Sequence, residues 1–243
     1  MILLPVESYE IRTTEKKGSG IFALREIAPG TIIGDYLGRI IDDAEGERLG
    51  KELGACYDMD YDGHLSIFPL DIKAPGVHLI NHSCSPNVNT YYYYGHTLFF
   101  ALRRVLPDEE ITLDYGLDPD QEVGFVYPCY CHSPLCRGTM YINPERLKQY
   151  GRFSFSETAG QVFEHLPVGA ILEPLLEYPV EIKDNVVFDL FAKLDAEPVT
   201  YNDEKLPDIL EIRLRLRETG CPLAFTRLGL IIWGIVDSHL ILK

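Results

Sequence analysis

The sequence predicts a mainly β protein with a mixed or α-helical C-terminal extension. Over the first half of the chain, short runs of β-branched and aromatic residues are separated by glycine and proline turns, which is typical of strands. Residues 208–219 instead have the apolar and charged content of an amphipathic helix, which Gly220 can end. Residues 228–236 form an apolar run that fits a buried helix or strand.

The first clear pattern is a glycine-rich entry to a predicted β-hairpin. Gly18-Ser19-Gly20 precedes an apolar run at residues 21–24, which predicts a strand. Pro29-Gly30 fits the two central positions of a type II turn, because proline fixes the first φ and glycine tolerates the positive second one. Residues 31–38 predict the second strand of the hairpin.

A short helix and further strands follow. Residues 42–53 are charged, with Ala44, Leu49 and Leu53 on one side, and they predict a helix. Residues 56–61 alternate as a strand does, and Asp62-Gly63 is typical of a hairpin turn. Strands are also predicted at residues 88–94, 98–102 and 111–116.

The segment at residues 78–87 is a polar loop with an apolar entry. Its asparagine and serine side chains favour turns over regular ladders, and Pro86 restricts the backbone further. A solvated surface turn is the ordinary interpretation of such a run. Leu79 and Ile80 argue against it here, because they should be buried and would anchor the loop in a core.

Composition limits the classes of partner. The chain has 243 residues and a net charge of −15, so lysine and arginine are well outnumbered. This excludes tight, direct nucleic-acid binding, which needs clustered basic residues, and it suits a basic protein partner. We expect a soluble protein of the nucleus or cytoplasm, because no signal peptide or transmembrane segment is evident. The six cysteines are then thiols or metal ligands rather than disulfides.

Three segments, in order along the chain, resemble those of SET-domain lysine methyltransferases. They are Gly18-Ser19-Gly20 with its following strands, Asn81-His82-Ser83-Cys84-Ser85-Pro86-Asn87, and the run from Glu110 to Asp114-Tyr115-Gly116. The resemblance covers residues 9–142 and implies a SET pseudoknot of short sheets, in which the last segment passes under the asparagine-histidine loop. It divides the chain into a SET core at residues 1–116, a post-SET segment at 117–142 and an extension at 143–243.

The resemblance also implies the cofactor and the catalytic residues. Tyr115 would supply the hydroxyl that orients the lysine amine, and Tyr57 would line the lysine channel. S-adenosylmethionine would be bound by residues of all three segments and of the loop behind them: Lys17, Gly18, Ser19, Gly20, Asn81, His82, Tyr115, Leu135 and Met140. Leu113 stands where relatives often carry an aromatic ring, so the number of methyl groups transferred stays open.

Three cysteines follow at Cys-x-Cys-x4-Cys spacing, which resembles the post-SET zinc motif. Cys129, Cys131 and Cys136 lack one ligand for the tetrahedral site that structural zinc prefers, and Cys84 is the candidate fourth. His132 is a rival fourth ligand, although its place between the cysteines would strain the loop. A disulfide pair with spare thiols is the alternative to one structural zinc site.

The resemblance implies S-adenosylmethionine-dependent methylation of a protein lysine, with a histone tail as the substrate and chromatin regulation as the setting. Two alternatives stay open: a SET fold that only binds its partner, and a methyltransferase for a non-histone protein. Residues 143–243 carry no second catalytic motif, so they are interpreted as a packing domain or as a docking or dimerisation lobe. The sequence does not indicate an oligomeric state.

Overall fold

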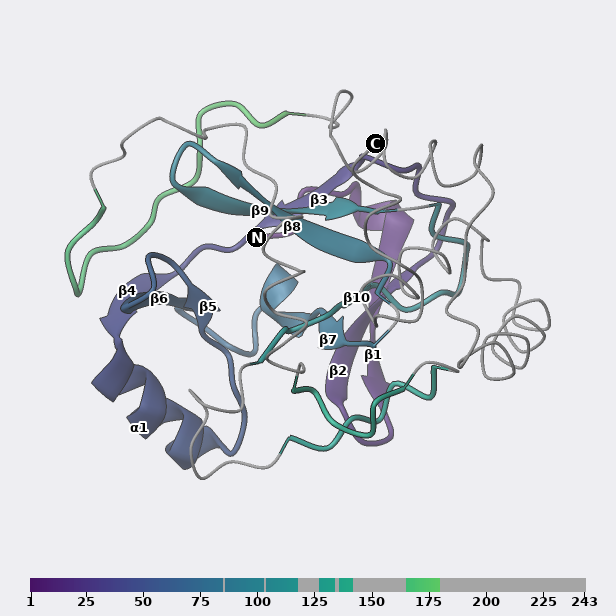
Figure 1. The fold of residues 1–243 in the computed structure, drawn as a ribbon. Helices are drawn as coiled ribbons and strands as arrows, with labels where there is room; N and C mark the ends of the chain where they lie inside the picture. The colour runs from purple at the N-terminus through teal and green to yellow at the C-terminus, as the bar shows by residue number, and fades with distance from the viewer. Residues whose placement is uncertain (85, 103, 118–126, 134–135, 142–164, 180–243) are drawn as a thin grey trace, which may run out of the picture. The chain divides into compact units, whose positions relative to one another are not determined.

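The computed structural model describes residues 1–84, 86–102, 104–117, 127–133, 136–141 and 165–179 (Figure 1). The chain divides into two compact units. Unit one comprises Met1–Asn81, Val88–Ile111 and Ser156–Ile182, and unit two comprises His82–Asn87, Thr112–Phe155 and Lys183–Lys243. The described residues are mostly strands with one α-helix, which confirms the mainly β prediction. The segments predicted at 208–219 and 228–236 lie outside them, and the domain boundaries after residues 116 and 142 stay predictions.

The described part of unit one contains three small antiparallel sheets. Their orders are β1-β2, β3-β9-β8 and β4-β6-β5. The elements of this unit are the 3₁₀ turns η1 (Val6–Ser8) and η2 (Val77–Leu79), the helix α1 (Asp43–Leu53), and the strands β1 (Tyr9–Thr14), β2 (Gly18–Ala23), β3 (Ile32–Asp35), β4 (Arg39–Asp42), β5 (Met59–Asp60), β6 (Leu65–Phe68), β8 (Val88–Tyr93) and β9 (His96–Ala101).

The predicted hairpin of the first two strands is wrong in its pairing. The turn itself forms as expected: Gly30 has φ +83°, and the Thr31 N–H donates to the Ala28 carbonyl oxygen at 3.2 Å. However, β2 pairs backward with β1, and β3 pairs with β9. A turn fixes only the local direction of the chain, whereas the partner of each strand is chosen by distant residues.

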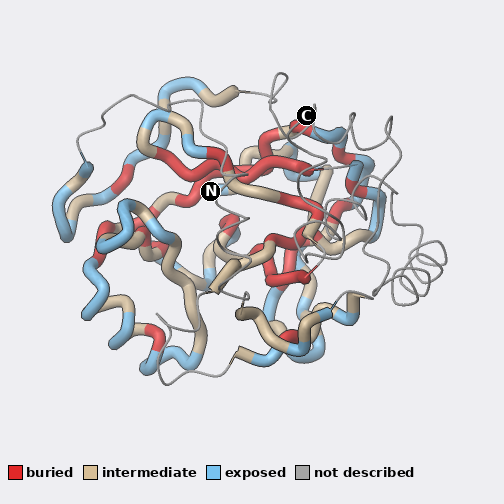
Figure 2. Tube along the Cα trace, viewed as in Figure 1, coloured by how far each residue is buried: buried red, intermediate tan, exposed pale blue. Residues whose placement is uncertain are grey.

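The core of unit one lies on its central strands, where the buried stretches of Figure 2 gather. Phe99 and Phe100 of β9 are at most 1% exposed, and every residue of β9 is buried. Large aliphatic side chains that are fully buried complete this core: Ile21, Ile33, Ile40, Ile41, Ile67, Leu98 and Ile111. Burial of each such side chain contributes about 1.5–3 kcal/mol, so the sheets of this unit are stabilised mainly by apolar packing.

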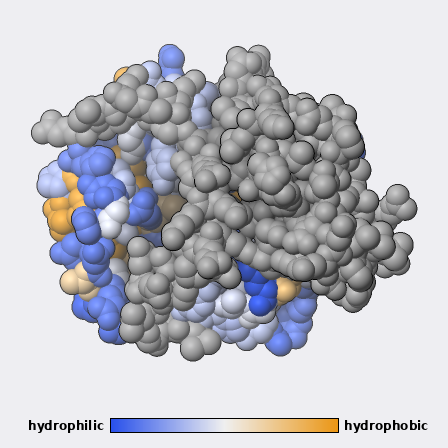
Figure 3. All heavy atoms as spheres, in the orientation of Figure 1, coloured by the Kyte–Doolittle hydropathy of each residue, from blue (hydrophilic) through white to orange (hydrophobic). Residues whose placement is uncertain are grey.

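The helix α1 forms where the sequence predicts it. Asp42 caps its N-terminus, because the carboxylate accepts the Glu45 N–H at 2.9 Å, and Gly54 ends it with φ +65°. Its exposed side is hydrophilic in Figure 3. Arg39 of β4 forms a two-pronged pair with Glu45 at 3.0 and 2.8 Å, which ties the helix to the sheet beside it. No helix among the described residues is long and apolar enough to span a bilayer.

Residues 165–179, called the strap below, add to the outer edge of β4. The Gly169 N–H donates to the Ile40 carbonyl oxygen at 2.9 Å, the Ile40 N–H donates to the Ala170 carbonyl oxygen at 2.8 Å, and the Leu172 N–H donates to the Gly38 carbonyl oxygen at 2.9 Å. Farther along, the Tyr178 hydroxyl donates to Asp35 at 2.8 Å. The sequence did not indicate this pairing.

Unit two, in its described part, has little regular structure. The strand β10 (Thr112–Leu113) forms a two-stranded sheet with β7 (Asn81–His82). The expected strand at residues 111–116 is therefore only two residues long. The remaining described residues of this unit are loops that carry the cysteines, an ion pair and two tyrosines in edge contact.

Candidate functional site

The glycine segment of unit one is crowded at Gly20 and open at Gly18. Gly18 has φ +72°, which favours glycine. A Cβ atom on Gly20 would lie 2.7 Å from a Glu110 carboxylate oxygen and 2.8 Å from the Asn81 side-chain nitrogen. Both distances are far inside van der Waals contact, so a side chain at position 20 would have to displace the ends of the Glu110 and Asn81 side chains. The signal read from Gly18-Ser19-Gly20 therefore has a steric cause.

Asn81 and Glu110 hold this segment in place. The Asn81 Nδ2 donates to the Ser19 carbonyl oxygen at 3.0 Å and to Glu110 Oε1 at 2.8 Å. The other carboxylate oxygen of Glu110 pairs with the Lys17 ammonium. The structure thus brings together the predicted cofactor residues Lys17, Ser19, Gly20 and Asn81. Glu110 was missed as their partner, because the sequence showed it only as the acidic residue that begins the third segment of the resemblance.

Tyr57 lies in unit one, outside the strand predicted for it. Only Met59–Asp60 is strand, and the Tyr57 carbonyl accepts a hydrogen bond from the Tyr36 hydroxyl. The Tyr57 ring meets the His78 ring edge-on, with centroids 6.3 Å apart. Its assignment to a lysine channel stays a prediction.

In unit two, the two motif segments lie side by side. The Ser83 N–H donates to the Leu113 carbonyl oxygen at 2.9 Å, and the Asn87 N–H donates to the Thr112 carbonyl oxygen at 3.1 Å. In return, the Thr112 N–H donates to Asn87 Oδ1 at 2.8 Å. These bonds join segments about 30 residues apart along the chain. Whether one segment threads beneath the other, as in a pseudoknot, stays a prediction.

His82 holds the main chain of Tyr115. Its imidazole is fully buried, and Nδ1 accepts the Tyr115 N–H at 3.1 Å. The ring therefore carries its hydrogen on Nε2, which lies 3.4 Å from the Cys84 Sγ. The rings of His82 and Tyr115 meet edge-on at 5.4 Å. His82, predicted as a cofactor residue, therefore also supports the main chain of Tyr115 with its side chain.

Asp114 and Arg137 form a buried ion pair in unit two. Both terminal nitrogens of Arg137 contact the carboxylate, at 2.6 and 2.7 Å, and the two side chains are only 10% and 6% exposed. Burial by itself would lower the pKa of Arg137. The hydrogen bonds and the negative charge of Asp114 have the larger effect, so the pKa of Arg137 is raised. This pair joins the tyrosine segment to the cysteine segment, and the sequence analysis did not identify it.

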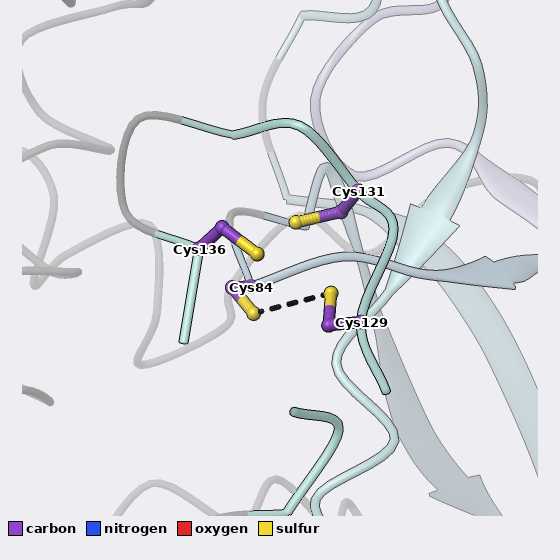
Figure 4. A group of neighbouring side chains, drawn as sticks. All are labelled: Cys84, Cys129, Cys131 and Cys136. Atoms are coloured by element: carbon purple, nitrogen blue, oxygen red, sulfur yellow. Dashed lines mark hydrogen bonds between the residues drawn. The ribbon is translucent and has the colours of Figure 1, made fainter. Parts of the chain in front are cut away.

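The four predicted metal ligands lie together (Figure 4). The Sγ atoms of Cys84, Cys129, Cys131 and Cys136 are all within 4.8 Å of one another, and those of Cys84 and Cys129 are 3.6 Å apart. Among the described residues, this group contains no histidine, so His132 is not a member. The five cysteines that the structure describes are free thiols, and four of them form this group.

The geometry of this cysteine cluster fits a tetrahedral zinc ion. With Zn–S bonds of about 2.3 Å, the edges of the tetrahedron are about 3.8 Å, close to the Cys84–Cys129 distance. Main-chain N–H groups stabilise thiolates here: Arg137 N donates to Cys84 Sγ at 3.3 Å, and Gly138 N donates to Cys136 Sγ at 3.4 Å. Hydrogen bonds from Cys129 and Cys84 lower the pKa of Cys131 and so favour its thiolate, the form that a metal binds, whereas hydrogen bonds with Cys129 and Cys131 raise the pKa of Cys84.

The remaining predicted cofactor residues are less well placed. Met140 lies in the cysteine loop, where its N–H donates to the Tyr127 carbonyl oxygen at 2.9 Å. Leu135 lies outside the described residues. Gly18 is exposed at the start of β2, with nothing within 4 Å of an added Cβ. Their contacts with a cofactor stay predictions.

Comparisons with known proteins find similarity mainly in the first half of the chain. Residues 18–116 match the family model described as the SET domain. Histone-lysine N-methyltransferase SUVR5 of Arabidopsis thaliana is 29% identical over 155 residues, which cover 54% of this chain and 11% of that protein. Histone-lysine N-methyltransferase SUV39H1 of Xenopus laevis is 32% identical over 122 residues, covering 45% of this chain and 29% of the relative.

A third relative is also named a histone-lysine N-methyltransferase. Histone-lysine N-methyltransferase Set2 of Drosophila melanogaster is 34% identical over 149 residues, which cover 54% of this chain and 6% of that protein. The chain spans less than a third of the length of each of these three relatives. The match at residues 18–116 begins at the glycine segment and ends just after Tyr115.

Proposed function

We propose that this chain transfers methyl groups from S-adenosylmethionine to a lysine side chain of a protein, with a histone tail as the substrate class. The observation that carries the proposal is Tyr115. It stands one residue before the end of the SET match, and its main chain is held by the buried imidazole of His82. The relatives named histone-lysine N-methyltransferases support both the reaction and the substrate class.

The proposed reaction needs a neutral amine and an aligned approach. A lysine amine has a pKa of about 10.4 in water, so it must lose its proton before it attacks, and an apolar channel favours that loss. When bound, S-adenosylmethionine supplies an activated methyl group on a sulfonium centre. The Tyr115 hydroxyl orients the amine lone pair, and Tyr57 lines the lysine channel. Alignment of this kind can supply much of the rate enhancement.

The residues around the glycine segment suit the methionine part of the cofactor, which carries both an ammonium and a carboxylate. Lys17 and Glu110 present one charge of each sign, and Asn81 fixes Glu110 beside the Ser19 backbone. The exposed Gly18 leaves its backbone open to a ligand. Residues His82, Leu135 and Met140 are assigned to the adenine part of the cofactor.

The cysteine cluster is assigned one structural zinc ion. Four thiols and no open ligand position are typical of a structural site rather than a catalytic one. The ion would bind Cys84 of the polar loop to three cysteines about 45–52 residues later, and would thereby close the post-SET segment. Zinc content measured by inductively coupled plasma mass spectrometry tests this, with one ion per chain as the expected result.

A histone tail fits the charge of the protein. At −15 the chain attracts a lysine- and arginine-rich segment and accelerates its encounter, particularly at low salt. A non-histone protein with a basic segment would be attracted in the same way. An array of basic peptides incubated beside intact nucleosomes separates these two substrate classes.

The experiment that tests the function is methyl transfer by the wild type and by Tyr115→Phe. Mass spectrometry of nucleosomes incubated with S-adenosylmethionine should show methyl-lysine with the wild type and a loss of about 100-fold or more with the variant. Tyr94→Phe, at a tyrosine that is 51% exposed, is the matched control and should keep full activity. Equal activity of Tyr115→Phe and wild type contradicts the assigned role. A wild type that binds donor and peptide without transfer is a binding module instead.

A further inference from the structure

We propose that Arg137 is a positioning residue that couples the cysteine cluster to Tyr115, an inference that rests on the proposed function of Tyr115. Arg137 directly follows Cys136 in the chain, and its own N–H donates to Cys84 Sγ at 3.3 Å. Its main chain is therefore fixed by two members of the cluster. Its side chain leaves the cluster and ends on the tyrosine segment.

The guanidinium fixes the residue before Tyr115. It contacts both oxygens of Asp114, at 2.6 and 2.7 Å, and such a two-pronged pair sets orientation as well as distance. The same carboxylate accepts the Gly116 N–H at 3.2 Å. The Asp114 side chain is thus bonded to the main chain of the residue after Tyr115, and Arg137 fixes the position of that side chain.

A second link reaches Tyr115 from the same cluster. Cys84 lies 3.4 Å from His82 Nε2, and His82 Nδ1 accepts the Tyr115 N–H at 3.1 Å. His82 Nδ1 also lies 3.5 Å from Asp114. Because this nitrogen is an acceptor, it cannot donate to the carboxylate, so the charge of Asp114 is balanced by Arg137. The tyrosine main chain is held between two connections that both begin at the cysteines.

The Asp114–Arg137 ion pair is buried, so removal of either side chain should disturb the structure around it. Removal of one partner of a buried ion pair leaves an uncompensated charge, which the chain relieves by moving that charge toward water. Asp114 would then leave its place beside Gly116, and Tyr115 would move with it. The cysteines themselves would stay together, because all four thiols remain.

The test compares Arg137→Met, which keeps the length of the stem, with Arg137→Lys, which keeps the charge. We expect Arg137→Met to lower kcat for methyl transfer about 10- to 100-fold, as supporting residues around metal sites typically do, with the KM for peptide and one zinc per chain unchanged. Arg137→Lys should recover part of the loss. Arg48→Met, at an arginine on α1 whose side chain is 60% exposed, is the control and should match the wild type.

A double-mutant cycle shows whether Arg137 acts through Asp114. Asp114→Asn should lower kcat by a similar factor, and the double variant should lose no more than the worse single variant. Additive losses would mean that the two side chains act separately and would reject the coupling. Loss of zinc from both Arg137 variants would make Arg137 a support of the metal site alone and would also reject it.

Amide hydrogen exchange gives a readout that is independent of activity. In protein labelled with ¹⁵N-tyrosine, the Tyr115 signal is the one missing from Tyr115→Phe. Its exchange should be faster in Arg137→Met than in wild type or Arg48→Met, because the bond to His82 is loosened. Unchanged exchange overturns the coupling. A wild type that transfers no methyl group contradicts the proposed function, whereas the exchange result still decides the coupling.

Discussion

The two units of this chain are built on different interactions. Unit one has three sheets around fully buried side chains such as Phe99, Ile40 and Ile67. The described part of unit two has one two-stranded sheet. Its loops are instead brought together by four clustered thiols and by a buried arginine–aspartate pair. Apolar packing is insensitive to metal ions, whereas a thiol cluster without its ion is a group of crowded sulfurs. We therefore expect the fold of unit one to be independent of metal and the site in unit two to depend on it.

The largest effect is expected from removal of the metal. Treatment with a strong chelator, or the substitution Cys129→Ser, should abolish methyl transfer, because Arg137 and His82 lose their anchor at the cysteines. Hydrogen exchange followed by mass spectrometry should show lost protection over residues 127–133 and 136–141. Peptides from β3 and β9 should stay protected.

Two controls sharpen that result. Cys56→Ser, at a thiol outside the cluster, should leave activity and exchange unchanged. Addition of zinc to the chelator-treated protein should restore methyl transfer and the protection from hydrogen exchange. Equal loss of protection in β9 would show that unit one also depends on the metal, and the contrast between the units would then be wrong.

The next largest effect concerns the apolar packing of unit one. Phe99→Ala should lower the free energy of unfolding by about 3–5 kcal/mol, because the ring is 1% exposed and its removal leaves a cavity. Urea unfolding followed by circular dichroism measures this loss. Leu106→Ala, at a side chain that is 45% exposed, is the control and should have a small effect. A small effect of Phe99→Ala itself would contradict a core centred on β9.

The smallest expected effect is a dependence of the free energy of unfolding on pH, which arises from His78 in unit one. Burial lowers the pKa of His78, and the hydrogen bond with the Ile72 carbonyl only partly opposes this. The unfolded chain then binds the proton more readily, so stability should be full above pH of about 6.5 and fall as the pH drops below it. His78→Gln should flatten this part of the curve, and His64→Gln, at a side chain that is 90% exposed, should not. If stability depends on pH as steeply in His78→Gln as in the wild type, the dependence arises from other groups.

Elements with local signals could be predicted from the sequence. The charged run at residues 42–53, with its apolar side, predicts α1, and Pro29-Gly30 predicts a turn whose geometry depends on those two residues alone. The cysteine cluster was also predictable, because few thiols were available and their spacing left one ligand to find. In each case, the residues that fix the structure are neighbours in the chain or belong to a rare chemical type.

Features that depend on distant partners could not be predicted. Nothing near β2 or β3 indicates that they pair with β1 and β9 instead of each other. Glu110 and Arg137 are ordinary charged residues in the sequence, and only the fold shows that they hold the Asn81 side chain and Asp114. Ion pairs of this kind have no periodicity and no fixed spacing, so a single sequence contains no signal for them.

The strap covers an edge of β4, and a shortened chain that lacks residues 165–179 would expose that edge. A chain ending before residue 165 would keep the whole SET match but would uncover the backbone of Gly38 and Ile40. Bare edges of this sort recruit strands from other molecules, so such a fragment should precipitate at concentrations where the intact chain stays dispersed. A fragment that is to stay dispersed therefore has to include residues 165–179, and the place to cut lies beyond residue 179.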